Sequence, residues 1–516
     1  MNLGRVMQRS ARYWPNAFAA VDKRRRLTFA ELDGETSRLA TGLMAAGFPA
    51  GTHIAMQAAN CVEILATEIA CYKGAFVKVP VNARLSAEES VHVINDSHAE
   101  VVIAGPKHAA DLADRRDQMP RLKKIVAISG DAGDLLYSEL LDLGKTGFES
   151  LDTNESDLAV LHYTSGSSGV LKAAMQSYGN RAALLRKQLI RPGNDGGFGF
   201  TMGHVGPITH ASGMSILPTL YLGGCNVLFD RFDVPEFLAT IEKERINRIF
   251  LVPTMVSRIL ASEEIQKYDL SSLTGVVYGA APMAPSLVAE AMEAFGPILS
   301  QGYGAGETTS TITVLTAQDH IDALAGDRSR LASCGRSYFE NDVRILRDDG
   351  TECELGEAGE IVVRGPDIMQ GYWGAPELSA EVLKDGAYHT GDVATQDDEG
   401  YMFIVDRKKD MIISGGFNVY PSEVEKVLYS HPAVFEVAVV GVPDREWGEA
   451  VKAVIVTKNG AEVSPDILES FCRDNLPGFK RPRSFDFAQD LPRNPNGKIV
   501  RREVRNVYWA DAERKV

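Results

Sequence analysis

The sequence predicts an α/β protein with a large N-terminal domain of layered sheets and a small α+β C-terminal domain. The 516 residues are too many for one hydrophobic core. Up to about residue 340, short apolar runs alternate with helical stretches, as in layered sheets with largely parallel strands. From about Asp342 the strands become shorter and turns such as Asp348-Asp349-Gly350 appear, which indicates a small β-barrel-like subdomain.

Local patterns predict the individual elements. Thr28 and Glu31 form a capping box for a helix that ends at Gly47. In the N-terminal part we expect a further helix over 233–245 and strands over 53–56, 75–80, 101–103, 158–162, 249–252 and 273–278. In the C-terminal part we expect strands over 343–346, 360–363, 401–405, 437–440 and 450–456, and helices over 422–430 and 466–472.

A dense charge run, Asp406-Arg407-Lys408-Lys409-Asp410, follows the strand predicted over 401–405. We place the domain boundary there, which gives an N-terminal domain of residues 1–408 and a C-terminal domain of residues 409–516. The C-terminal domain is expected to be mobile.

Composition excludes several classes of protein. The formal net charge of −15 argues against broad nucleic-acid binding. The six cysteines include no Cys-x-x-Cys pair, so a reduced, cytoplasmic location is expected rather than a disulfide framework or a zinc site. No membrane span and no signal peptide are expected from the apolar runs. The sequence leaves open whether the protein forms a homodimer.

The most unusual stretch runs from Tyr163 to Lys172 and follows a short apolar strand. Glycines allow several backbone N–H groups to converge on one point, hydroxyl groups add donors, and Lys172 adds positive charge. Such a loop can wrap a phosphate chain, although it lacks the Gly-Lys of a Walker-type loop. A plain surface turn is the alternative for this stretch taken alone.

Three other stretches have chemical interest. In Gln301 to Thr309, glycines flank Tyr303 and leave room for a planar ligand, and Glu307 is a carboxylate suited to Mg²⁺. Asp392 follows a Gly turn, as does the carboxylate that accepts ribose hydroxyls in dinucleotide sites. Lys498 stands at the tip of a Pro- and Asn-rich loop and could meet developing negative charge. Each alone also fits a turn or a surface residue.

Together these stretches resemble the adenylate-forming superfamily, which contains acyl-CoA synthetases, stand-alone adenylation domains and firefly luciferase. Six motifs occur in the order that this family shows, and they span nearly the whole chain: 163–173, the Tyr-Gly-x-x-Glu of 303–307, 359–365, 388–392, 406–410 and 497–498. The resemblance implies that ATP and a carboxylic acid give an acyl-adenylate and pyrophosphate, and that a thiol, commonly coenzyme A, then displaces AMP.

Roles for single residues follow from the resemblance, motif by motif. Tyr303 would stack on adenine, Glu307 would bind Mg²⁺, Asp392 would hold the ribose hydroxyls, and Arg407 the ribose or phosphate. Lys498 would neutralise charge between carboxylate and α-phosphate during adenylation. The β- and γ-phosphates would be cradled by Thr164, Ser165, Gly166, Ser167, Ser168, Gly169 and Lys172, and adenine would be flanked by Gly279, Ala280, Ala281, Gly302 and Gly304.

The resemblance also implies a hinge at Lys409. The C-terminal domain would swing Lys498 out after adenylation and bring in Gly415 and Gly416, whose small size suits a pantetheine tunnel. A solvated surface lysine is the alternative for Lys409.

The sequence departs from the family at several positions. Leu171 and Ala173 flank Lys172 where a Pro and a Gly are usual, and Gly306 stands where a Thr before the Glu is common. The last change removes a hydroxyl that would contact the α-phosphate. These departures put a few phosphate contacts in doubt and leave the Lys, Glu and Asp in place.

The stretch from Pro207 to Gly213 stands where the family has a motif beside the carboxylate of the acid substrate, so we predict the acid pocket there. His210 could contact the acyl group, and the alternative is a histidine packed in the core. This stretch contains no Asp or Glu, so an amino acid is a disfavoured substrate. The predicted walls are mostly small or weakly polar and suit a bulky apolar acid, whether fatty, aryl or polycyclic: Ala211, Thr254, Met255, Thr308 and Thr309, besides Gly302 and Gly304.

We therefore predict an ATP- and Mg²⁺-dependent acyl-CoA synthetase that acts on a hydrophobic carboxylic acid, with Lys498, Glu307, His210 and Lys409 central to turnover. One alternative is an acyl-AMP ligase that transfers to a carrier-protein thiol, although the insertion before the hinge in such relatives is not seen here. A second is an inactive homologue that binds an acyl ligand and a nucleotide. A P-loop phosphotransferase is disfavoured by the missing Gly-Lys-Ser/Thr.

Overall fold

The structure is a computed structural model that describes residues 1–165, 171–190, 198–444, 446–458, 461, 463–493 and 499–509. Contacts divide the chain into two compact units. Unit 1 comprises residues 1–343, 363–389 and 399–401, and unit 2 comprises residues 344–362, 390–398 and 402–516. Most strands of the predicted small subdomain thus belong to unit 2, together with the C-terminal residues. The domain boundary at 408/409 stays a prediction.

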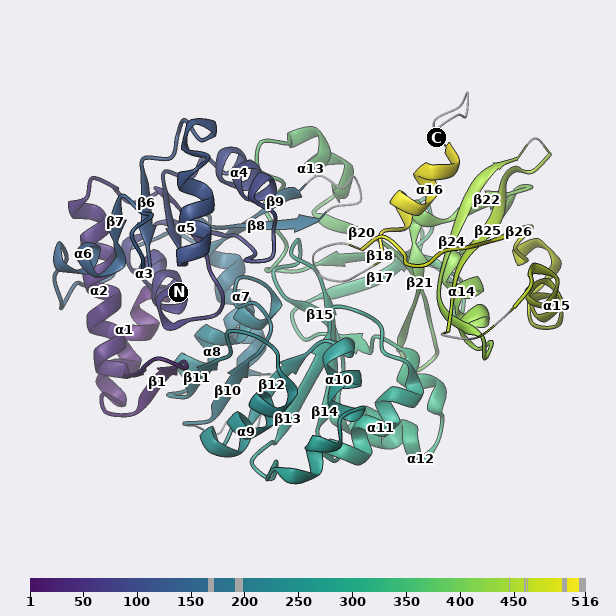
Figure 1. Cartoon of the computed structure of the whole chain (residues 1–516), viewed down its shortest axis with the longest axis horizontal. Helices are drawn as coiled ribbons and strands as arrows, with labels where there is room; N and C mark the ends of the chain where they lie inside the picture. Colours follow the sequence, from purple (N-terminus) through teal and green to yellow (C-terminus); the bar gives the residue numbers. More distant parts are fainter. Residues whose placement is uncertain are drawn as a thin grey trace. The chain divides into compact units, whose positions relative to one another are not determined.

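The first sheet of unit 1 has seven strands in the order β7-β6-β5-β3-β4-β8-β9, and only its last pair is antiparallel. Its strands are β3 (His53–Gln57), β4 (Val77–Pro80), β5 (Val101–Ala104), β6 (Lys124–Ala127), β7 (Leu135–Leu136), β8 (Leu158–Ser165) and β9 (Leu171–Ser177). Its helices are α2 (Phe29–Ala45), α3 (Val62–Gly74), α4 (Ala87–Asp96), α5 (Pro106–Ala113) and α6 (Tyr137–Asp142) (Figure 1).

Alternation along β5 explains why this sheet is covered on both faces. Val101 and Ile103 belong to a core with residues of α2, α3 and α6. Val102 and Ala104 point the other way and pack with residues of α4 and α5. Strands buried on both faces read as continuous apolar runs, which is the pattern that predicted a parallel sheet.

The second sheet of unit 1 has nine strands in the order β16-β15-β14-β13-β12-β10-β11-β1-β2, parallel from β14 to β1. Its strands are β1 (Phe18–Val21), β2 (Arg26–Thr28), β10 (Thr201–His204), β11 (Cys225–Leu228), β12 (Arg248–Leu251), β13 (Gly275–Gly279), β14 (Leu299–Gly304), β15 (Thr311–Leu315) and β16 (Arg336–Ser337). The helices that accompany it are α1 (Leu3–Tyr13), α7 (Tyr178–Leu189), α8 (Ile216–Tyr221), α9 (Val234–Glu244), α10 (Pro253–Leu260), α11 (Pro285–Phe295) and α12 (Ala317–Ala325) (Figure 1).

A third, five-stranded sheet has the order β17-β18-β20-β19, with β21 paired to β20. It consists of β17 (Asp342–Leu346), β18 (Gly359–Arg364), β19 (Leu383–Lys384), β20 (Ala387–Gln396) and β21 (Met402–Arg407), and α13 (Pro376–Val382) precedes β19.

The fourth sheet lies in unit 2 and has the order β23-β22-β25-β24, with β26 beside β25. The unit is held by alternation along β24, because Val437 and Val439 enter one core and Ala438 and Val440 the other. Its elements are β22 (Ile412–Ser414), β23 (Phe417–Val419), α14 (Pro421–Tyr429), β24 (Val434–Asp444), β25 (Gly448–Thr457), α15 (Pro465–Asn475), β26 (Ser484–Phe487) and α16 (Arg501–Trp509).

The observed elements confirm the predicted α/β layers and the small C-terminal α+β unit. The capping box is present at the start of α2, where Thr28 accepts from Glu31 N–H and Glu31 caps the Thr28 N–H. Each other predicted strand and helix is found within a few residues of its expected bounds. Within the described residues, no helix is long and apolar enough to cross a membrane.

A buried ion pair fixes how the segment after β18 packs on α7. Lys187 Nζ lies 2.6 Å from Asp367 Oδ2 and also donates to Asn341 Oδ1 and Thr311 O, each at 2.5 Å. Both charged side chains are almost fully buried. Burial lowers the pKa of Lys187, an effect that Asp367 opposes. Two residues of α7, Asn180 and Lys187, thus anchor the segment, because Asn180 donates to Pro366 O and Ile368 O.

We expect Lys187→Met to destabilise unit 1 by about 3 kcal/mol, because it leaves Asp367 as a buried charge without its cation. Lys123→Met is the matched control, since Lys123 pairs with Glu100 at the exposed surface, and it should cost less than about 1 kcal/mol. The measurement is chemical denaturation of the full chain. Equal losses in the two variants would contradict the anchoring described above.

Candidate active site

The β8–β9 hairpin presents one polar face. The strands pair so that Thr164 lies opposite Lys172 and His162 opposite Ala174. Leu161, Tyr163 and Ala173 belong to the opposite face and pack in the core with α4 and α5. Because side chains alternate along a strand, His162, Thr164 and Lys172 share the face away from that core.

Glu307 is a buried carboxylate on the loop between β14 and β15, with 7% of its surface exposed. The Thr164 hydroxyl donates to its Oε1 at 3.1 Å, and the Tyr372 hydroxyl donates to the same oxygen at 2.8 Å. Among the described residues, none donates a hydrogen bond to Oε2. One oxygen is therefore fixed, while the other has no donor among the described residues, an arrangement that suits a Mg²⁺ ion held by one carboxylate together with phosphate oxygens.

Tyr372 was not singled out from the sequence. Residues 369–373 run beside β9, with Met175 N–H donating to Gly371 O and Trp373 N–H donating to Ala173 O, both at 2.9 Å. Lys172 Nζ lies 4.1 Å from the centre of the Tyr372 ring. Burial lowers the pKa of Lys172, and the Glu307 carboxylate opposes that shift. The signal that could have found Tyr372 is the glycine before two aromatic residues at 371–373.

His162 and His210 face each other, with ring centroids 5.5 Å apart at an angle of 64°. Burial, reinforced by Lys78, lowers the pKa of His210 to about 4. Burial, with the nearby His210, holds the pKa of His162 well below its usual value. Both rings are half-buried. Two neutral imidazoles therefore stand at the predicted carboxylate end of the acid pocket.

Asn60, just before α3, holds the loop that bears His210. Asn60 donates to His204 O at 3.1 Å and to Gly206 O at 2.8 Å, and it accepts from Ile208 N–H at 2.9 Å. The Thr209 hydroxyl lies 3.0 Å from His210 Nδ1. Among the described residues, Nε2 of His210 has no hydrogen-bond partner, whereas Nδ1 has Thr209.

A buried charge network lies behind the two histidines. Lys78 Nζ lies 2.8 Å from Glu68 Oε1, and Arg181 Nη2 lies 3.4 Å from the same oxygen. Arg181 also contacts Gln176 Oε1 at 3.4 Å, and Gln176 donates to Gly306 O at 2.9 Å. Two cations share one carboxylate, so the net positive charge disfavours protonation of His162 and His210. The network also reaches the loop that carries Glu307.

The backbone is closely packed at the glycines that are predicted to flank adenine. Gly279 lies opposite Gly302 in the β13–β14 register, and a Cβ at Gly279 would lie 2.4 Å from Gly302 O. A Cβ at Gly304 would lie 2.2 Å from Ser310 O. Tyr303 between these glycines is half-buried, Ala280 is exposed with φ of 65°, and Ala281 is half-buried.

The remaining predicted pocket residues of unit 1 are on separate elements. Thr254 and Met255 are in the first turn of α10, and Ala211 begins a short 3₁₀ helix. The Thr308 hydroxyl closes its own loop, since it accepts from Ala305 N–H at 3.0 Å and donates to Ser310 O at 2.7 Å. The Thr309 hydroxyl is buried without a hydrogen-bond partner among the described residues, at a φ of 54°.

Asp392 and Arg407 form a cross-strand pair in unit 2. They are register partners on β20 and β21, and Arg407 Nε lies 2.5 Å from Asp392 Oδ1. Lys409 is exposed in the 3₁₀ turn Lys408–Asp410. Gly415 and Gly416 make the β22–β23 turn with φ of 57° and 82°. A Cβ at Gly415 would lie 2.3 Å from the Trp447 ring, so only glycine fits there.

The charge run 406–410, which contains the predicted hinge, makes contacts with both α14 and α16. Arg501 Nη1 lies 2.9 Å from Asp406 Oδ1 and 3.5 Å from Asp410 Oδ2, and Arg501 Nε lies 2.8 Å from Glu425 Oε1. Ser422 N–H donates to Asp406 Oδ2 at 2.7 Å. Despite burial, these carboxylates raise the pKa of Arg501 above its usual value.

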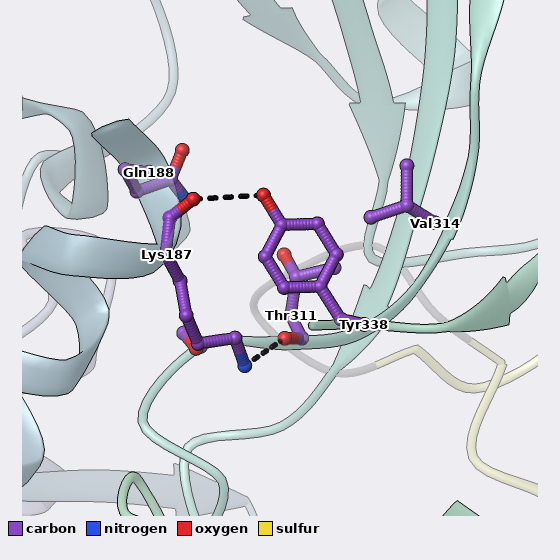
Figure 2. Close-up of a pocket in the computed structure, with 6 residues that line it drawn as sticks. Lys187, Gln188, Thr311, Val314 and Tyr338 are labelled. Carbon is purple, nitrogen blue, oxygen red and sulfur yellow. Dashed lines mark hydrogen bonds between the residues drawn. The ribbon is translucent and has the colours of Figure 1, made fainter. Parts of the chain in front are cut away.

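Several predicted residues lie outside the described residues: Gly166, Ser167, Ser168, Gly169 and Lys498, together with the side chain of Ser165. The pocket in Figure 2 is lined by Lys187, Gln188, Ser310, Thr311, Val314 and Tyr338, none of them a predicted site residue. Figure 2 shows that its polar groups bond to each other, with Tyr338 OH donating to Lys187 O and Lys187 Nζ to Thr311 O. This pocket is part of the buried anchor of α7.

Comparison with known proteins identifies the family. The family model of AMP-binding enzymes matches residues 7–373, and that of the AMP-binding enzyme C-terminal domain matches residues 423–498. The chain belongs to the AMP-binding enzyme family, as its motifs predicted. The matches also confirm the predicted enzyme class, an AMP-forming acid–thiol ligase of the acyl-CoA synthetase branch.

Named relatives extend over nearly the whole chain. A feruloyl-CoA synthase of an Amycolatopsis species is 40% identical over 98% of this chain and 99% of its own length. The medium/long-chain-fatty-acid–CoA ligase FadD8 of Mycobacterium tuberculosis is 33% identical over 95% of this chain and 87% of its own. The crystal structure of ATP-bound MatB from Rhodopseudomonas palustris aligns with a TM-score of 0.88 at 28% identity, covering all of both chains.

The lowered pKa of His210 predicts that acid destabilises unit 1. The pKa is about 4 in the folded protein and near 6.5 in the unfolded chain, so between these values the unfolded chain binds more protons. Stability is therefore retained above about pH 6.5 and is lost as the pH falls towards about 4. We expect His210→Asn to lose about 2 kcal/mol less than the wild type between about pH 7 and pH 5, measured by denaturation at each pH. His92→Asn, which changes an exposed histidine, should follow the wild type; a His210→Asn curve parallel to the wild type would contradict the assignment.

Proposed function

We propose that this acyl-CoA synthetase activates an aryl carboxylic acid of the hydroxycinnamic type, using ATP and Mg²⁺, and transfers the acyl group to coenzyme A. The observation that carries the proposal is the full-length match to a feruloyl-CoA synthase at 40% identity. The neutral, uncharged lining offered by His162 and His210 supports an acid whose only charge is its carboxylate.

The proposed ATP contacts follow the family roles. Thr164 and Lys172 would meet the β- and γ-phosphates together with residues 165–169, and Tyr303 would stack on adenine beside Gly279, Ala280, Ala281, Gly302 and Gly304. Asp392 and Arg407 would hold the ribose. The Asp392–Arg407 pair supports this, since a carboxylate can accept hydrogen bonds from two hydroxyl groups and the arginine holds it in position.

We place the Mg²⁺ on Glu307 Oε2. The ion would supply charge neutralisation for the phosphate chain, and the residues of this chain would orient it. Thr164 and Tyr372 would hold the carboxylate from its other oxygen, and Lys172 would add positive charge next to it. Among the described residues no cluster of three metal-binding side chains occurs, in keeping with a metal that takes most of its ligands from substrate and water.

The two half-reactions would share one site by domain alternation. Lys498 would stabilise the charge that builds as carboxylate oxygen attacks the α-phosphorus and pyrophosphate leaves. A turn at Lys409 would then bring Gly415 and Gly416 towards the pantetheine arm. We expect a cytoplasmic enzyme, in keeping with six unpaired cysteines; transfer to a carrier-protein thiol in place of coenzyme A is the alternative to be tested.

The deciding experiment is acid-dependent ATP–pyrophosphate exchange over ferulate, other hydroxycinnamates, benzoates and medium- to long-chain fatty acids, followed by AMP release with coenzyme A. We expect exchange with the hydroxycinnamates and AMP release that requires coenzyme A. Exchange confined to fatty acids would refute the proposed acid class. Exchange without coenzyme A turnover would favour the carrier-protein acceptor.

A second prediction concerns the metal. Tyr372→Phe should raise the Mg²⁺ concentration for half-maximal exchange about tenfold, because Glu307 loses a partner that orients it. Tyr163→Phe is the matched control on the opposite face of the hairpin, where the hydroxyl bonds to Asp96 at 2.6 Å. A similar shift in both variants, or none in Tyr372→Phe, would argue against Glu307 as the metal ligand.

A further inference from the structure

The space beside Gly306 is already filled. Gly306 precedes Glu307 and stands where the adenylate-forming enzymes commonly have a threonine. A Cβ at this position would lie 2.6 Å from His162 Cδ2 and 2.6 Å from Thr164 Cγ2, both closer than real Cβ contacts. The glycine is therefore required by its neighbours in this chain, and the imidazole of His162 takes up the volume of the missing side chain.

His162 also offers a polar atom at that place. Its Nε2 lies 3.3 Å from the position of the added Cβ, so the ring brings a nitrogen close to the place of the missing side chain. Within the described part of the chain, neither ring nitrogen makes a hydrogen bond, and the ring contacts His210 at an angle of 64°. The ring is half-buried and neutral at physiological pH, so it is a hydrogen-bond donor or acceptor that adds no charge.

Its neighbours place His162 between two parts of the candidate site. On one side its ring faces His210, at the predicted carboxylate end of the acid pocket. On the other, Thr164 follows two residues along β8 on the same face and bonds to Glu307, the proposed metal ligand. A group between the acid and the metal-bound phosphates is well placed for the α-phosphate, where the acid attacks.

We infer that His162 donates a hydrogen bond from Nε2 to a non-bridging oxygen of the α-phosphate, in place of the threonine hydroxyl that Gly306 lacks. The inference rests on the proposed function for its substrates. In the adenylation step a carboxylate oxygen forms the bond to phosphorus while the bond to pyrophosphate breaks, and His162 keeps its proton throughout. Its contribution is to stabilise the oxygens that gain charge as the bond forms.

The test measures AMP affinity by calorimetry, because AMP carries the α-phosphate and needs no identified acid. His162→Ala should weaken AMP binding about tenfold, the usual loss for a hydrogen bond to a charged group. Gly306→Thr should also weaken it, because the new side chain meets the ring. The double variant His162→Ala with Gly306→Thr should bind AMP no worse than Gly306→Thr alone, since alanine removes one of the two close contacts while the Thr164 methyl group must still move.

His162→Gln provides the conservative rescue, because its amide can donate from about the same distance along the side chain as Nε2. It should bind AMP better than His162→Ala, and thermal melting should show all variants folded. An unchanged affinity in His162→Ala, or a His162→Gln variant that binds AMP no better than His162→Ala, would overturn the inference. So would a loss in His162→Ala that appears only as a raised KM for the acid.

The outcomes separate this inference from the proposed function. AMP binding that depends on His162, without exchange for any acid, would keep the phosphate contact and refute the proposed substrate class. Exchange with hydroxycinnamates that is unaffected by His162→Ala would keep the proposed substrate class and refute the phosphate contact. A wild-type protein that does not bind AMP would overturn both.

Discussion

The candidate site depends on the two-residue period of the β8–β9 hairpin. Leu161, Tyr163 and Ala173 are held in the core on one face, and this fixes His162, Thr164 and Lys172 on the other. A shift of one residue would exchange the two sets and bury the polar one. Apolar packing beneath the hairpin, reinforced by the Tyr163–Asp96 hydrogen bond, therefore decides which side chains meet Glu307.

Buried charges then position the segments that reach this face. The Lys187–Asp367 pair anchors the chain that continues to Tyr372, and Glu68 with Lys78 and Arg181 supports the loop before Glu307 through Gln176. Such groups add little net stability compared with apolar residues of the same size, but breaking one is costly. Through these contacts they hold the segments that carry Glu307 and Tyr372.

Much of the fold was predictable because it rests on local signals: the capping box at Thr28, the apolar runs of the parallel strands and the glycine-rich motifs. The family followed from the order of those motifs. Tyr372 and His162 were missed, since Tyr372 reaches Glu307 across 65 residues of sequence and His162 was counted within an apolar strand. Gly306 was interpreted as a lost contact, because a sequence shows the absent side chain but not the neighbour that fills its space. The stretch 166–169 and Lys498 lie outside the described residues, so their predicted roles remain predictions.

The contacts of Arg501 have a consequence for the energetics of the chain around Lys409. Asp406 precedes Lys409, whereas Glu425 and Arg501 itself follow it, so the guanidinium bridges the two sides of the predicted turn. Any rotation there must part Asp406 from Arg501 and from the Ser422 amide. If the chain turns at Lys409 as predicted, these contacts would oppose the turn, and salt would screen them only weakly because Asp406 is buried.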